Sequence, residues 1–145
     1  MRWRSEPFRP FFPLGVLLGW IGIGHWLLYS VGITATYSCM LHGLVQTQAF
    51  LMAFAVGFLL TALPRRTQGA PASAVELWIA AAALTVTALA VVAERWLVAQ
   101  VAYGVVLLLL LQFAIRRFLG RNTQDVHLPR LLRARVVDER RIALR

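Results

Sequence analysis

The chain has 145 residues, of which 59% are hydrophobic and 14% charged, and its mean hydropathy is +0.68. This composition excludes an ordinary soluble domain and indicates a membrane protein. A single cysteine excludes an internal disulfide. The net charge of +9 comes without any motif that reads nucleic acid, so we expect no nucleic-acid partner.

The arginines mark the ends of four apolar runs. All 15 basic residues are arginine: three precede the first run, two follow the second, one follows the third and nine follow the fourth. If the N-terminus is cytoplasmic, every arginine except the one after the third run lies on the cytoplasmic side, as the positive-inside rule requires. We therefore predict an all-α, integral membrane four-helix bundle with cytoplasmic N- and C-termini.

A cytoplasmic segment at residues 1–10 precedes a membrane domain at residues 11–118. Each apolar run is long enough to cross the hydrocarbon core. The predicted spans are residues 11–33, 39–63, 75–93 and 97–115. We expect Pro10 and Pro13 to set the start of the first span, with Glu6 paired to Arg9 just before it.

The second span is uncharged, yet it is the most polar of the four. It begins with Cys39, Met40 and His42 and continues with Gln46. Polar groups inside hydrocarbon usually mark a pairing, a ligand or a pathway, so we expect any site to involve this span. A turn-rich loop starting at Pro64 should end it.

The third span should begin with a capping box, because Ser73 stands three residues before Glu76. Only Glu94 and Arg95 separate the third span from the fourth. One helix over residues 75–115 would be about 60 Å long, about twice the thickness of the hydrocarbon core. We therefore predict a tight hairpin at this point.

The basic tail, residues 119–145, repeats leucine and valine at helical spacing among arginines, at Leu128, Leu131, Leu132 and Val136. This pattern is typical of an amphipathic helix lying on anionic lipid headgroups. A disordered tail and a partner-binding helix are the alternatives.

Small residues recur at three- and four-residue steps on the first two spans, at Gly15, Gly19 and Gly22 and at Ala49, Ala53 and Gly57. Continued along the second span, the stripe reaches His42 and Gln46 at one end and Thr61 at the other. Helices in lipid associate through close contact at small residues, so we expect this face to look into the bundle.

The candidate site lies near the outer side of the first two spans. His25 and Gln46 should be nearly level, about 10–12 Å below the outer end, which predicts a hydrogen bond between them. His42 should lie about 7 Å from the level of His25, which argues against both histidines holding one haem within this pair. Cys39, Met40 and His42 are soft or borderline ligands that suit Cu(I). In the alternative interpretation, both histidines are hydrogen-bonded structural residues, and Cys39 and Met40 are interfacial.

Two blocks, residues 6–12 (EPFRPFF) and residues 57–64 (GFLLTALP), resemble the opening of the NnrS family in order and spacing. That family comprises haem- and copper-containing bacterial inner-membrane proteins linked to nitric oxide and nitrosative stress. The resemblance implies this location and these cofactors, with the chain covering the N-terminal third of such a protein. The family's His-x-His-Glu-Met stretch places its first histidine on His42, whereas Leu44 and Val45 stand where its second histidine and glutamate would be.

Our first hypothesis is a multi-pass inner-membrane protein that binds haem or copper at His42, with His25 and Gln46 supporting it. Our second is a cofactor-free membrane subunit that assembles with a copy of itself or with a membrane partner through the glycine and alanine faces. A membrane enzyme ranks third, because we find no nucleophile–base pair.

Overall fold

The computed structural model describes the backbone of residues 6–143 and the side chains of residues 6–119. This described part is built from helices: α1 (Phe8–Ser30), α2 (Cys39–Leu44), η2 (Val45–Leu51), α3 (Met52–Thr67), α4 (Ala74–Val92) and α5 (Trp96–Ala143). α2, η2 and α3 follow one another without a break and form one rod. The described residues thus contain four helical rods long and apolar enough to cross a membrane. The predicted all-α, four-helix membrane fold is confirmed.

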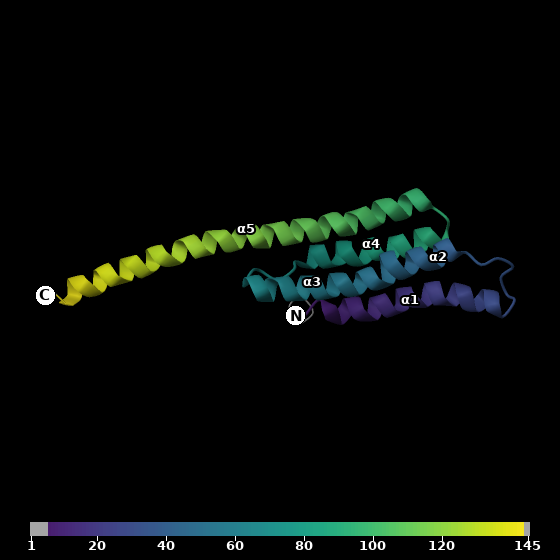
Figure 1. Cartoon of the computed structure of the whole chain (residues 1–145), viewed down its shortest axis with the longest axis horizontal. Helices are drawn as coiled ribbons and strands as arrows, with labels where there is room; N and C mark the ends of the chain where they lie inside the picture. The colour runs from purple at the N-terminus through teal and green to yellow at the C-terminus, as the bar shows by residue number, and fades with distance from the viewer. Residues whose placement is uncertain (1–5, 144–145) are drawn as a thin grey trace.

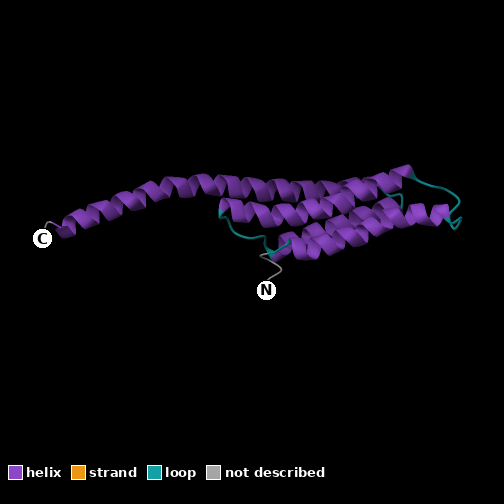
Figure 2. Ribbon diagram, turned by 60° about the horizontal axis from the view of Figure 1, so that its bottom comes forward, coloured by secondary structure: helices purple, strands orange, loops and turns teal. Residues whose placement is uncertain are grey.

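The four rods lie side by side and run alternately up and down (Figures 1 and 2). α1 packs along α2, η2 and α3, and α4 packs along α5, while η2 also contacts α4 and α3 contacts α5. The N-terminal end of α1 lies at the end of the bundle from which α5 projects (Figure 1). Four rods that alternate in direction thus bring the start of α1 and the far end of the fourth span to one side. That this side is cytoplasmic stays a prediction.

Small residues fill the contact between α1 and the second rod. A methyl group added to Gly15 or Gly19 would fall within 2.8 Å or 2.7 Å of the ring of Phe54 or Phe50, respectively. Ala49 and Ala53 are fully buried on the opposite side of this contact. The prediction that the small-residue face of the second span looks into the bundle is confirmed. The same glycine and alanine faces are therefore used inside the chain, which corrects our hypothesis that they are free for assembly with a partner.

Helix ends differ from the predicted spans by a few residues. α1 begins at Phe8, so Pro10 and Pro13 lie within its first two turns and do not set its start. It ends at Ser30, because Gly32 takes a φ of +77° and the amide of Ile33 returns to the carbonyl of Leu28.

The second rod continues through Pro64 to Thr67, four residues beyond its predicted end. Proline removes one backbone donor, and the last turn of a helix tolerates that loss better than its middle. The stop comes from Gln68, which has a φ of +52°, with the amide of Gly69 bonded to the carbonyl of Pro64.

The predicted capping box and hairpin are both confirmed. The Ser73 hydroxyl accepts from the amide of Glu76 at 3.2 Å, and the Glu76 carboxylate accepts from the amide of Ser73 at 2.7 Å. α4 ends at Val92, Glu94 takes a φ of +56°, and α5 starts at Trp96.

α5 runs without a break through residue 119 to Ala143, so no change of element separates the fourth span from the tail. Figure 1 shows this extension leaving the bundle as a continuation of the span. The amphipathic pattern at Leu128, Leu131, Leu132 and Val136 lies outside the described side chains. Its binding to lipid headgroups stays a prediction.

Candidate functional site

The wide turn of η2 positions the polar part of the second rod. Over Val45–Leu51 the backbone is π-helical, which places more residues in each turn than an α-helix does. In an α-helix, residues four apart drift by about 40° around the axis at each step. The wider turn offsets this drift, and Val45, Ala49 and Ala53 all remain fully buried against neighbouring helices. Thr47 supports the local change by donating to the carbonyl of Gly43 at 2.8 Å.

His42 and Gln46 both bind backbone carbonyls of α1. The His42 Nδ1 lies 3.1 Å from the carbonyl oxygen of Gly22, and the Gln46 Nε2 donates to the carbonyl of Gly19 at 3.0 Å. Glycine makes these carbonyls reachable, since a methyl group on Gly22 would lie 2.8 Å from the Gln46 amide nitrogen. The predicted His25–Gln46 hydrogen bond is wrong, because each side chain is engaged with a nearer backbone group.

The contact to Gly22 fixes the tautomer of His42. A carbonyl oxygen only accepts hydrogen bonds, so Nδ1 carries a proton, and in the neutral imidazole Nε2 then keeps its lone pair. A histidine whose Nδ1–H is held by a backbone carbonyl is oriented in the way that metal-ligating histidines usually are. His42 as a whole is half-buried.

His25 has the opposite arrangement. Its Nε2 accepts a hydrogen bond from the amide of Ser38 at 3.0 Å, so that lone pair is occupied. Ser38 is the N-cap of α2, and its hydroxyl accepts from the amide of Leu41 at 3.1 Å. His25 thus ties the loop between α1 and α2 to α1 and sets the start of the second rod.

Tyr37 stands between the two histidines. Its ring centroid lies 5.8 Å from that of His25, with planes 20° apart, and 6.4 Å from that of His42. Tyr29 also packs on Tyr37, at 5.7 Å. Sequence reasoning missed this role of Tyr37, because a ring that separates two histidines is set by the loop path and not by helical spacing.

The predicted soft ligands lie at the rim of this cluster. Cys39 and Met40 occupy the first turn of α2 and are both exposed, Met40 by 59%. Among residues 6–119, no three His, Cys, Asp or Glu side chains come together as a metal site would need. Within residues 6–119 the donor set therefore fits one imidazole ligand, His42, and does not form a closed metal centre.

The positions of the missing family ligands are apolar packing positions. Val45 is fully buried, and its Cγ1 lies 3.3 Å from where a methyl group on Gly22 would sit. Leu44 is half-buried and belongs to the apolar cluster around Val91. A carboxylate in place of Val45 would be buried against α1, where an unpaired charge is costly.

The two sequence blocks meet at the opposite end of the bundle. The Thr61 hydroxyl accepts from the amide of Phe8 at 3.2 Å and donates to the carbonyl of Gly57 at 2.7 Å. A methyl group on Gly57 would lie 2.9 Å from the Cβ of Phe11. The predicted ion pair between Glu6 and Arg9 is present. Residues 6–12 and 57–64 thus form one packing unit that caps the start of α1.

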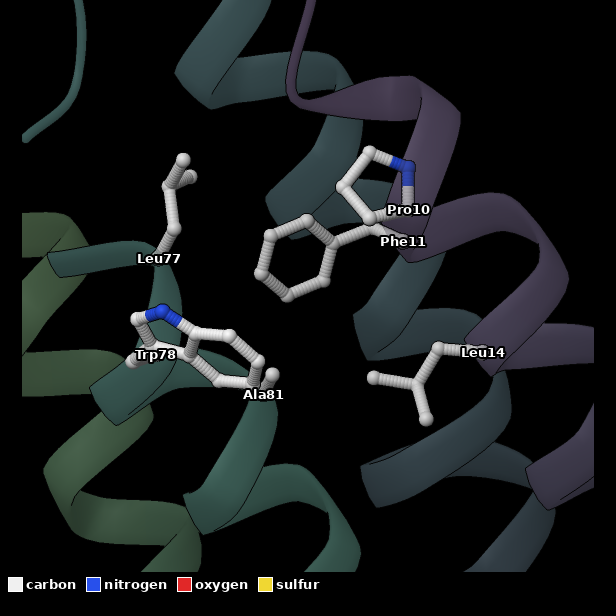
Figure 3. Close-up of a pocket in the computed structure, with 6 residues that line it drawn as sticks. All are labelled: Pro10, Phe11, Leu14, Leu77, Trp78 and Ala81. Carbon is white, nitrogen blue, oxygen red and sulfur yellow. The ribbon is translucent and has the colours of Figure 1, made fainter. Parts of the chain in front are cut away.

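An apolar hollow of 270 Å³ lies between α1 and α4 and is lined by Pro10, Phe11, Leu14, Leu77, Trp78 and Ala81. Figure 3 shows Phe11 and Leu14 facing Trp78 and Ala81 across it. Its lining has no acid, base or metal ligand, so these residues suit an apolar group and offer no catalytic or metal-binding side chain.

A family model described as NnrS protein matches residues 2–136 of the chain. The match extends well beyond the first 65 residues and includes the third and fourth spans. No curated protein and no solved structure matches the chain.

Proposed function

The chain belongs to the NnrS family, and from that premise we propose that it is a multi-pass bacterial inner-membrane protein that binds haem or copper through His42. We further propose that it acts in the response to nitric oxide or nitrosative stress. The observation that carries the proposal is the 3.1 Å contact between Nδ1 of His42 and the carbonyl oxygen of Gly22, which orients the ring and leaves Nε2 without a hydrogen-bond partner among residues 6–119. The bound group would supply the redox chemistry.

The remaining ligands must come from outside the pair of histidines. The Nε2 of His25 already accepts a hydrogen bond from the amide of Ser38. The Nε2 of Gln46 already donates one to the carbonyl of Gly19. Gln46 and His25 are therefore supporting residues in this proposal, which hold the first two rods in register. Cys39 is the ligand type nearest in sequence to His42, exposed and three residues away on the same helix. It is our candidate second ligand when copper is bound, with Met40 beside it.

Purified protein provides the test. We expect a haem Soret band, or stoichiometric copper by elemental analysis, in the wild-type protein, and its loss in His42→Gln. The matched control is His127→Gln, which replaces a histidine in the basic tail and should leave the spectrum unchanged. His25→Gln should lower thermal stability while retaining the cofactor. A wild-type protein that shows neither group, even after incubation with excess haem and copper, would refute this proposal.

The second candidate function, a cofactor-free subunit acting through assembly, is favoured by a polar pair on the membrane-facing surface. The amides of Gln48 and Gln100 bond to each other in both directions, at 3.3 and 3.2 Å, between η2 and α5. Gly104 follows one turn later on α5, with nothing within 4 Å of an added methyl group. An exposed amide pair beside an open glycine suits a helix of a second copy, because small residues and side-chain amides join helices in lipid.

Comparing the variants Gln100→Leu and His42→Gln distinguishes the assembly function from cofactor binding. Gln100→Leu should weaken self-association in detergent or bilayers if assembly is the function, while His42→Gln leaves association intact. The cofactor proposal expects the opposite pattern in the absorbance spectrum. Ala102 provides the control, since it is buried two residues from Gln100, and Ala102→Ser should change neither readout.

A further inference from the structure

A second hollow lies between α1 and α3, at the end of the bundle where α1 begins. Its volume is 460 Å³, and its lining residues are Phe8, Phe12, Phe58, Thr61, Ala62, Arg65 and Arg66. We call it the Arg65–Arg66 hollow. Its size falls in the range of small-ligand sites, and it combines an apolar floor with a cationic rim.

The floor is made of exposed aromatic rings. Phe12 is 37% exposed and Phe58 is 61% exposed. Phe12 packs against Phe8 at 5.8 Å and against Phe54 at 4.8 Å between ring centroids, so its ring is part of a larger aromatic surface. Such a surface suits a hydrocarbon chain, whereas these aromatic rings offer no hydrogen bond or charge to a free inorganic anion.

The rim carries positive charge that no carboxylate among residues 6–119 neutralises in an ion pair. Arg65 and Arg66 are both exposed, and among residues 6–119 the ion pair present is Glu6 with Arg9. Glu6 lines a neighbouring hollow of 330 Å³ that shares Thr61 and Arg65. Three arginines against one glutamate leave this end of α1 and α3 with two net positive charges.

We propose that the Arg65–Arg66 hollow binds an anionic phospholipid. The phosphate lies between the two guanidinium groups, and an acyl chain crosses Phe12 and Phe58 towards the bilayer. Guanidinium pairs with phosphate oxygens through paired hydrogen bonds, and basic pockets between membrane helices on the cytoplasmic side are suited to lipid headgroups. The site is separate from His42, which lies on the outer part of the same rod.

The test measures lipid retained by the full-length protein in detergent, using native mass spectrometry with phosphatidylglycerol and with phosphatidylcholine. Each arginine near a membrane surface contributes about 1 kcal/mol to anionic lipid binding. At 1.4 kcal/mol for each factor of ten, Arg65→Gln or Arg66→Gln should weaken phosphatidylglycerol binding about fivefold and the double variant about thirtyfold. Phosphatidylcholine binding should change little. Both arginines are exposed, so the variants should keep the melting temperature of the wild type.

Two further variants separate the hollow from general surface charge. Arg133→Gln with Arg135→Gln removes the same charge from the tail and should leave this lipid bound. Ala62→Leu fills part of the hollow with the charge intact and should reduce binding at unchanged melting temperature. If Ala62→Leu has no effect, or if the tail variant weakens binding as much as the rim variant, the proposal is overturned. Displacement of the lipid by excess inorganic phosphate, or loss of a dimer in place of a lipid, would overturn it as well.

Discussion

Replacing Gly57 by alanine tests whether the two family blocks are held together by backbone contact. The added methyl group would lie 2.9 Å from the Cβ of Phe11 and 3.1 Å from the Cα of Phe8. Both are fixed parts of α1 and cannot rotate away. α1 and α3 would have to separate by about 0.5 Å to reach ordinary contact at 3.4 Å, and such overpacking typically costs about 1–3 kcal/mol.

Gly104→Ala is the matched control, because the same methyl group meets nothing within 4 Å on α5. Both variants gain the helical preference of alanine, about 1 kcal/mol, so that gain cancels when they are compared. Gly15→Ala should fall between them, since its two nearest neighbours are atoms of the Phe54 side chain, at 2.8 and 3.0 Å, and a side chain gives way more readily than backbone. The expected order of stability is Gly104→Ala, then Gly15→Ala, then Gly57→Ala.

The assay is unfolding of the detergent-solubilised protein by heat or by titration with a denaturing detergent, followed by circular dichroism. We expect Gly57→Ala to be about 1–3 kcal/mol less stable than Gly104→Ala. Equal stabilities would refute the close contact between α1 and α3. A Gly57→Ala protein that unfolds normally but loses a dimer would restore the assembly interpretation of this face.

Three further substitutions test the contacts at the same end of the bundle. Thr61→Val removes the acceptor at the start of α1 and should cost about 1 kcal/mol, measured against Thr87→Val, whose hydroxyl bonds only within its own helix. Arg117→Gln removes the donors to two carbonyls of the loop before α4 and should speed proteolysis in that loop, whereas exposed Arg116→Gln should not. Ser73→Ala breaks the capping box and should lower the unfolding free energy by about 1 kcal/mol, and no change in the melting temperature would contradict the cap.

Sequence patterns predicted the elements well, because each depends on local chemistry. Length and hydropathy located the four spans, the Ser73–Glu76 spacing located the cap, and the charged break at Glu94 located the hairpin. The end of the second rod was predicted before Pro64, because proline marks a probable helix end. The helix instead continues to Thr67 and stops where Gln68 takes a left-handed conformation.

The site was predicted less well, because its contacts depend on the path of the backbone. The residues His25, His42 and Gln46 were identified, but their partners are carbonyls and an amide that sequence does not single out. The π-helical turn left no sequence signal that we recognised, although it decides which side chains of the second rod face α1. The separating role of Tyr37 depends in the same way on the loop between the first two rods.

The register between α1 and the second rod links the two ends of the molecule. At one end the hydroxyl of Thr61 accepts from the amide of Phe8, and at the other Gln46 and His42 reach the carbonyls of Gly19 and Gly22. All three contacts involve the backbone of α1, so sliding that helix by one turn, about 5.4 Å, would break them together. The contact that fixes the His42 tautomer thus requires the register that the block at residues 57–64 maintains. Close packing at Gly57 and the Thr61–Phe8 hydrogen bond at one end, and the His42–Gly22 contact at the other, thus depend on the same position of α1 along the second rod.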